Sequence, residues 1–260
     1  MSAGAPAAQE SRRDELDRRL NAVRLRISDA ARAAGRPDQP ELIVVTKFFP
    51  ASDVRLLAGL GVRAVGENRD QEAAAKAEAL RDLPLDWNFI GQLQTNKAKS
   101  VVRYASAVQS VDRTGLVSAL DKAVARENER RREAGESART ALRCLIQVDL
   151  RQPTGDASGA ETGPAGRGGV EPAGVLSLAA AIDAAPWLEL GGVMAVAPLG
   201  ADPAEAFARL VDVSRAVRAA YPGADAVSAG MSQDLEQAVA AGATHLRVGS
   251  DVLGPRPPLR

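Results

Sequence analysis

A lysine, an arginine and a group of serines and glycines have the clearest chemical potential in this chain. In the stretch "ELIVVTKFFP", Glu41–Pro50, five apolar or β-branched residues in a row predict one buried strand, and Lys47 follows them directly. A buried ammonium is unfavourable unless it is paired or deprotonated. At a strand end, partial desolvation favours the neutral amine, which can attack a carbonyl. Lys47 is therefore a candidate Schiff-base nucleophile.

The last forty residues contain a candidate phosphate site. The stretch "VSAGMSQDLEQAVAAG" places two serines and a glycine where a strand meets a helix, which is expected to begin near Ser232 and stop at Gly242. The stretch "LRVGSDVLG" then ends another strand with Gly249 and Ser250. Helix N-termini attract anions, and glycine lets the backbone approach a phosphate closely. "AGMS" alone is as compatible with a plain helix cap, but together the two stretches predict phosphate binding.

Arg247 completes this group of residues. It has the same strand parity as Gly249, so both face the same side of the sheet. A guanidinium inside a protein needs an acceptor, which can be a cofactor ring nitrogen, a phosphate or a structural carboxylate. A Schiff-base lysine, a phosphate site and a fixed cation are together what pyridoxal 5'-phosphate (PLP) requires.

Two periodicities alternate along the chain and predict how these residues are positioned. A helix is expected over 10–34, because apolar residues recur on one face of it from Leu16 to Ile27. Apolar runs then predict eight strands, at residues 42–47, 63–68, 87–92, 107–112, 142–149, 190–196, 225–230 and 245–250. Helical patterns lie between them, at residues 52–60, 69–80, 96–104, 114–134, 172–185, 203–220 and 232–241.

This alternation predicts the fold class. Strands separated by helices indicate right-handed βαβ units and a parallel sheet. Eight such units favour an α/β fold of the (β/α)8 TIM barrel type, with an extra N-terminal helix, over a doubly wound open sheet. In a barrel, the carboxyl ends of the strands form one rim, to which we assign Lys47, Asn68, Gln92, Asp112, Asp149, Met194, Ser228 and Ser250.

The remaining reactive residue types have plain explanations. His245 is the only histidine, lies two residues before Arg247 and is expected to be a satisfied core residue deeper in the barrel. Cys144 is expected to be a small core residue. Asp112 and Asp149 are expected to bind neighbouring basic side chains, with acid/base chemistry as the alternative.

Composition excludes several function classes. The 33 basic and 33 acidic residues balance, which gives no support for binding nucleic acid or an anionic membrane. One cysteine allows no internal disulfide, and no metal site is expected. No apolar run approaches the length of a membrane span, and the N-terminus lacks a signal core, which favours a cytoplasmic protein. We expect a single domain over 1–260, with residues 1–9 disordered, a flexible glycine-rich loop over 151–172 and a tail over 255–260.

Seven stretches carry a family resemblance, and they span most of the chain from about Leu42 to Gly254. They are "VVTKFFP", "VGENRDQE", "NFIGQLQTNK", "QSVDR", "QVDL", "GGVMAV" and "SAGMSQDLEQAVAAGATHLRVGSDVLG". With them the chain resembles the pyridoxal phosphate homeostasis protein family, single-domain relatives of the N-terminal barrel of alanine racemase (fold-type III PLP proteins).

The resemblance implies a role for each site residue. Lys47 would be the Schiff-base lysine, Arg247 would lie against the pyridine nitrogen, and Asn68 with Met194 would line the ring pocket. The phosphate would be held by Ser228, Gly230, Met231, Ser232, Gly249 and Ser250.

This chain departs from the family pattern at two positions and in one loop. It has Arg69 where a tyrosine is common and Asn88 where a histidine is common, so contacts of that ring or imidazole are not carried over. The loop over 151–172 is longer than usual, and no role is carried over to it.

The resemblance also implies a function. Members bind PLP reversibly and buffer or deliver it, with PLP-dependent apoenzymes as possible recipients and no established reaction, so no catalytic residue is assigned. A racemase needs a second acid or base across the ring, and with eleven residues after Gly249 we expect no second domain to supply it. We expect a monomer. The alternatives are a PLP-dependent amino-acid racemase and a cofactor-free Schiff-base aldolase that binds a sugar phosphate.

Overall fold

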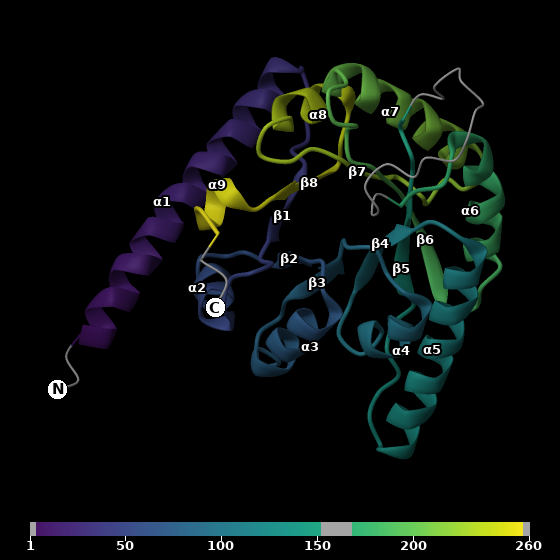
Figure 1. Ribbon diagram of the computed structural model, residues 1–260, viewed down its shortest axis with the longest axis horizontal. Coiled ribbons are helices and arrows are strands. Elements are labelled where there is room, and N and C mark those ends of the chain that lie inside the picture. The colour runs from purple at the N-terminus through teal and green to yellow at the C-terminus, as the bar shows by residue number, and fades with distance from the viewer. Residues whose placement is uncertain (1–3, 152–167, 257–260) are drawn as a thin grey trace.

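The described residues form a closed barrel of parallel strands surrounded by helices (Figure 1). The structure is a computed structural model that describes residues 4–151 and 168–256. The strands are β1 (Glu41–Val45), β2 (Ala64–Glu67), β3 (Asp86–Phe89), β4 (Ala107–Val111), β5 (Leu142–Gln147), β6 (Leu188–Met194), β7 (Ala226–Ser228) and β8 (His245–Val248). Each strand pairs with the next, and β1 pairs with β8, so the predicted TIM barrel is confirmed and the open sheet is wrong.

The helices follow the predicted order, with differences at their ends. They are α1 (Gly4–Ala33), α2 (Ala51–Gly59), α3 (Asp70–Ala79), η1 (Thr95–Lys97), α4 (Ala98–Val101), α5 (Thr114–Glu133), η2 (Pro172–Gly174), α6 (Val175–Asp183), α7 (Pro203–Ala220), α8 (Leu235–Ala241) and α9 (Ser250–Leu253). The pattern over 96–104 is split between η1 and α4, and α9 was not predicted. None of the helices in the described part of the chain is long and apolar enough to cross a membrane.

Three segments expected to lack regular structure overlap the undescribed residues. In the segment 1–9, residues 1–3 lie outside the described part and 4–9 belong to α1. In the segment 151–172, residues 152–167 lie outside it, and Val170 forms a parallel bridge with Val148. In the segment 255–260, residues 257–260 lie outside it.

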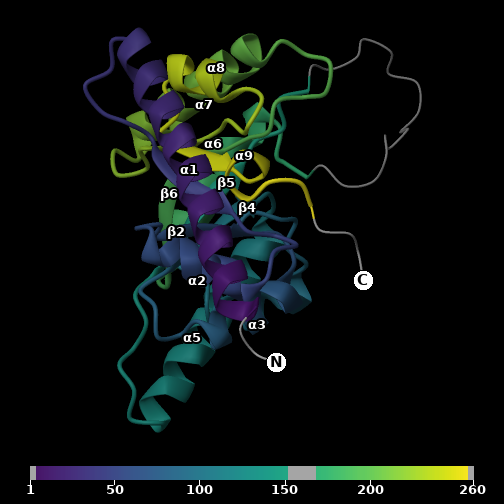
Figure 2. The same cartoon turned by 90° about the vertical axis from the view of Figure 1, so that its left-hand side faces the viewer.

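Helix α1 packs along one side of the barrel beside α8 and α9, as Figure 2 shows from that side. Its predicted apolar stripe is buried, with Leu16 and Leu20 fully inaccessible to solvent. Burial of a leucine or isoleucine side chain stabilises a fold by roughly 1.5–3 kcal/mol, so this stripe fixes α1 to the barrel. The structure therefore confirms the extra N-terminal helix.

The barrel interior differs from the layer between strands and helices. The outer layer holds the main hydrophobic cluster, which includes Val44, Val65 and Ile146. Leu145, Met194 and Ala226 form a separate, small hydrophobic cluster. Buried polar side chains on the strands include Asn88, Gln109, Ser228 and Arg247.

Candidate functional site

Lys47 lies in a tight turn that directly follows β1. Thr46 is fully buried, Lys47 is half-buried, and the Phe49 N–H donates to the Thr46 carbonyl to close the turn. Burial lowers the pKa of the Lys47 ammonium, and the guanidinium groups of Arg256 and Arg69 add to that effect, while Glu67 opposes it. Deprotonation to the neutral amine is thus easier than in an exposed lysine, as the sequence predicted.

Three cations surround the ring of Phe48. The Lys47 Nζ lies 5.9 Å from the ring centroid, and the guanidinium carbons of Arg69 and Arg256 lie 5.3 Å and 4.9 Å from it. Such distances allow cation–π attraction, which partly offsets repulsion between like charges. Arg69, one of the two positions at which this chain departs from the resembled family, contributes one of these cations.

The end of β2 carries two buried oxygens that lack a hydrogen-bond partner among the described residues. They are Glu67 Oε2 and Asn68 Oδ1. Buried polar atoms are almost always hydrogen-bonded, so an unsatisfied oxygen at a strand end points to a ligand or an ordered water. Asn68 is one of the two residues expected to line a ring pocket.

A chain of hydrogen bonds crosses the barrel interior from Arg247. The Arg247 guanidinium donates to Ser228 Oγ (2.7 Å) and to the Ala195 carbonyl (2.8 Å). Ser228 Oγ donates to Gln109 Oε1 (2.7 Å), and Gln109 Nε2 donates to Asn88 Oδ1 (2.9 Å). Burial lowers the pKa of Arg247 to about 10. Both acceptors of this buried cation are neutral, which leaves it without the carboxylate that usually accompanies a buried arginine.

Ser228 ends β7, as the sequence predicted, and its hydroxyl already has two partners. Its side chain is fully buried, and its hydroxyl is engaged by both Arg247 and Gln109. The strand parity of Ser228 was visible in the sequence, but the partner that its hydroxyl selects was not.

The loops after β7 and β8 meet through two serine hydroxyls. Ser232 Oγ lies 3.2 Å from Ser250 Oγ. Gly230 has a φ of +91°, and an added Cβ would lie 2.5 Å from the Cβ of Ala238, so only glycine fits there. A Cβ on Gly249 would lie 3.1 Å from the Val45 carbonyl oxygen. The predicted loops are thus adjacent, with two hydroxyls at their junction.

The start of α8 differs from the prediction because of Asp234. The Met231 N–H donates to Asp234 Oδ1 (2.6 Å), and this closes a turn before the helix begins at Leu235. The backbone N–H of Met231, a residue that the resemblance assigned to the phosphate, is thus satisfied by Asp234, and the Met231 side chain is exposed. Gly242 ends the helix with a φ of +107°, as predicted. Met194 is buried in the small interior cluster.

The plain explanations for Cys144, Asp112 and Asp149 are confirmed, whereas His245 is only partly buried and begins β8. Cys144 is fully buried, and burial raises its pKa to about 12. His245 Nδ1 lies 2.7 Å from Thr244 Oγ1, at the end of the barrel opposite Lys47. Asp112 pairs with Arg113 and Asp149 with Arg151.

The structure adds residues that the sequence did not single out. Glu67, Glu72 and Lys76 form a buried cluster beneath the Lys47 turn, with Lys76 Nζ 2.7 Å from a carboxylate oxygen of each glutamate. The i,i+4 spacing of Glu72 and Lys76 was the one available signal. Gln109 and Asp234 were also missed, although aspartate before a helix is a common cap.

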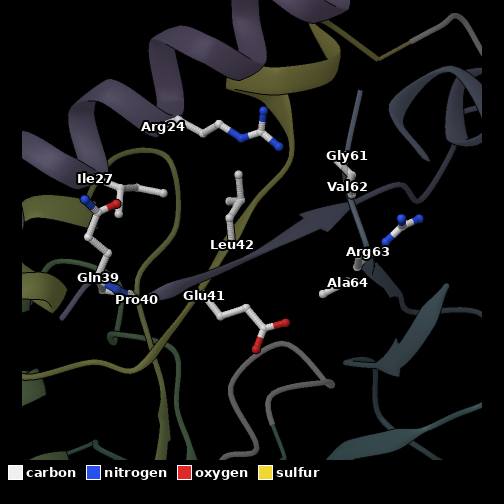
Figure 3. Close-up of a pocket in the computed structure, with 10 residues that line it drawn as sticks. All are labelled: Arg24, Ile27, Gln39, Pro40, Glu41, Leu42, Gly61, Val62, Arg63 and Ala64. Carbon is white, nitrogen blue, oxygen red and sulfur yellow. The ribbon is translucent and has the colours of Figure 1, made fainter. Parts of the chain in front are cut away.

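Two hollows lie away from these residues. Figure 3 shows one of about 370 Å³ at the amino ends of β1 and β2, where Arg24, Glu41 and Arg63 contribute to its lining. The other, of about 510 Å³, lies between α3 and the η1–α4 segment and is lined in part by Lys97 and Lys99. Across the described residues, no group of three or more His, Cys, Asp or Glu side chains is placed to hold a metal ion.

Comparison with known proteins places the chain in a class. The family described as alanine racemase, N-terminal domain, matches residues 19–257. The pyridoxal phosphate homeostasis protein of Mycobacterium tuberculosis H37Rv is 44% identical over 96% of both chains. That of Corynebacterium glutamicum is 39% identical over 90% of this chain and 99% of its own length.

A solved structure extends the comparison. PipY of Synechococcus elongatus, determined with PLP bound, is 30% identical and superposes with a TM-score of 0.70 over 92% of this chain and all of its own. The barrel thus belongs to the class of alanine racemase N-terminal domains. Within that class, the chain belongs to the pyridoxal phosphate homeostasis protein family.

Proposed function

We propose that this protein binds PLP reversibly as a Schiff base on Lys47 and takes part in PLP homeostasis, with little or no turnover. The observation that carries the proposal is the half-buried Lys47, whose pKa is lowered by burial and by two neighbouring arginines. The names of the family members and the PLP-bound PipY support the same choice of ligand.

The residues at the carboxyl end of the barrel fit this cofactor. The Ser232 and Ser250 hydroxyls, 3.2 Å apart, can both donate to one phosphate group. The Arg247 guanidinium, which contacts only neutral acceptors, can donate to a pyridine nitrogen. Asn68 Oδ1, buried without a partner in the described residues, can accept a hydrogen bond from a ring substituent.

Each of these groups acts on its own part of the ligand. When bound, PLP supplies an aldehyde that reacts with amines and a ring that withdraws electrons. Lys47 would hold the aldehyde carbon, and its lowered pKa makes the neutral amine available. Arg247 would donate to the ring nitrogen and oppose its protonation, because a guanidinium gives up its proton far less readily than a pyridinium.

We also propose that the protein acts as a monomer that transfers PLP to apoenzymes. Transfer requires that the linkage to Lys47 be reversible, and a lysine Schiff base meets that requirement through hydrolysis or exchange with another amine. Size-exclusion chromatography with light scattering, with and without PLP, measures the oligomeric state directly.

The visible absorption spectrum tests the central proposal. Addition of PLP should give a Schiff-base band, and borohydride reduction with peptide mapping should place the label on Lys47. Lys47→Ala should abolish the band and weaken PLP binding at least about tenfold. Lys99→Ala, at an exposed lysine on α4, is the matched control and should match the wild type.

Other outcomes would select another function. Label scattered over surface lysines, or unchanged affinity in Lys47→Ala, would contradict the proposal. Racemisation of amino acids that depends on Lys47 would favour the racemase. Binding of a sugar phosphate without any PLP band would favour the aldolase.

A further inference from the structure

The ammonium of Lys76 is buried beside the turn that carries Lys47. Its side chain is 7% exposed, and its Nζ has three acceptors within hydrogen-bond distance. These are the Thr46 carbonyl (2.9 Å), Glu67 Oε1 (2.7 Å) and Glu72 Oε1 (2.7 Å). An ammonium has three protons, so this geometry uses all of them and leaves none for a ligand.

The acceptors of Lys76 fix the backbone on both sides of Lys47. The Thr46 carbonyl lies in the peptide that precedes Lys47. Glu72 Oε1 also accepts from the Phe48 N–H (2.6 Å), which lies in the peptide that follows Lys47. Thr46 Oγ1 donates to Glu67 Oε1 (2.6 Å), so a third contact ties the end of β1 to the end of β2. One cluster thus determines the orientation of both peptide groups around the reactive lysine.

The backbone at Phe48 requires such support. Phe48 has a φ of +72°, and it is the one non-glycine residue with a positive φ in the described part of the chain. The left-handed conformation is unfavourable for a residue with a Cβ. Such strain persists only where the surroundings hold it, and it is concentrated at functional sites. Without the Glu72 contact, the Phe48 peptide is expected to rotate and carry the Lys47 side chain with it.

We propose that Lys76, with Glu67 and Glu72, is a positioning group that sets the direction in which Lys47 presents its amine to PLP. This inference rests on the proposed function, because it assigns Lys47 as the lysine that reacts. Lys76 itself does not touch the cofactor and acts through the two peptide groups beside Lys47.

A pair of substitutions at one position separates hydrogen bonding from packing. Glu72→Gln keeps an oxygen that can accept from the Phe48 N–H and from Lys76, whereas Glu72→Leu removes it. Lys76→Met removes the ammonium and keeps a side chain of similar length. Glu127→Gln, at a buried glutamate that pairs with Arg130 and Arg131 on α5, controls for the loss of a buried carboxylate elsewhere.

Two measurements report orientation rather than stability. The first is the visible circular dichroism of bound PLP per mole of label, which depends on how the cofactor is held. The second needs no cofactor: the rate at which Lys47 reacts with acetic anhydride in the apoprotein, measured across pH by peptide mass spectrometry. We expect Lys76→Met and Glu72→Leu to lose most of the dichroic signal and to weaken PLP binding about tenfold, with Glu72→Gln and Glu127→Gln within about threefold of the wild type.

The outcomes distinguish this inference from the proposed function. If wild-type label does not map to Lys47, the proposed function fails, and the apoprotein reaction rates still test the positioning role. If label maps to Lys47 and the variants keep wild-type dichroism, affinity and reaction rates, the positioning role is overturned. If the variants do not fold, amide exchange in the wild type decides: a Phe48 N–H that exchanges as fast as an exposed loop amide would overturn the role, and a protected one supports it.

Discussion

The two ends of the barrel carry their charges in different ways. At the amino end, Arg143 lies between Glu189 (3.8 Å) and Asp225 (3.6 Å), and His245 lies 3.4 Å from Glu41. At the carboxyl end, Arg247 contacts only neutral acceptors, and Lys47 lies among cations around one aromatic ring. Arg143 at the amino end thus faces two carboxylates, whereas neither Arg247 nor Lys47 forms an ion pair with a carboxylate of the described residues.

This difference bears on where a ligand would bind. The hollow in Figure 3 lies at the amino end, where Arg24, Glu41 and Arg63 contribute to its lining. At the carboxyl end, a phosphate and a ring nitrogen would satisfy groups that otherwise stay incompletely matched. Matched substitutions at the two ends test this contrast.

Two glycines with positive φ provide the largest expected contrast. Gly230→Ala is expected to lower the free energy of unfolding by about 3 kcal/mol or more, because strain adds to overpacking. Gly61→Ala, beside the amino-end hollow, adds a Cβ at 3.7 Å from the nearest neighbouring atom and should lower it by about 1 kcal/mol. Urea denaturation followed by circular dichroism measures both. Equal losses would show that the contact with Ala238 relaxes easily.

Two arginines test where the ligand binds. Arg247→Met is expected to weaken PLP binding about thirty- to hundredfold, because it removes a buried charged donor. Arg143→Met should leave the affinity within about twofold, since its partners lie at the other end. Absorbance titration with PLP gives both constants. A larger effect from Arg143 would reverse the assignment of the two ends.

The histidine at the amino end predicts a dependence of stability on pH. Burial lowers the pKa of His245 from 6.5 to about 4, so the unfolded chain takes up this proton first as the pH falls. Wild-type stability should therefore decline from about pH 6.5 to pH 4, by about 2 kcal/mol between pH 7 and pH 5.

A substitution isolates this contribution. His245→Gln should flatten the decline without changing PLP affinity at pH 8. Burial raises the pKa of Glu41, whose contribution has the opposite sign and falls as the pH rises. Urea denaturation at several pH values measures the slope, and an unchanged slope in His245→Gln would assign the decline to other groups.

The two serines proposed to hold the phosphate give the smallest expected effects. Ser232→Ala and Ser250→Ala should each weaken PLP binding about three- to tenfold, because one neutral donor is lost. Ser28→Ala, whose hydroxyl lies 3.3 Å from Gln39 Nε2 near the amino-end hollow, should change the affinity less than twofold. Competition by inorganic phosphate should weaken in the first two variants and persist in the third.

The sequence predicted the barrel because its signals are local. Apolar runs marked every strand, and the helices between them set the parallel order. The position of Lys47 after β1 and the end of α8 at Gly242 followed from neighbouring residues alone. The family resemblance then assigned residues that lie far apart in the chain to one site.

The contacts that orient the site could not be predicted from neighbouring residues in the sequence. Lys76 meets Thr46 across thirty positions, and that contact depends on how α3 rotates against β2. The Ser228 hydroxyl selects Gln109 across 119 positions. The left-handed Phe48 could not be expected, since phenylalanine rarely adopts that conformation. Strand parity gives the side on which a residue lies, and packing decides its partner.

Helix α1 has a consequence for the order in which the chain folds. Arg12 donates to the Leu253 carbonyl, and Arg26 pairs with Asp251 and Glu236, so the first helix finds its partners among the last elements to be synthesised. Before those elements are made, α1 can contact α2, where Arg12 pairs with Asp53, but it cannot contact α8 or α9, and contacts this distant form slowly. The docking of α1 can therefore be completed only after the last strand and helix have been synthesised.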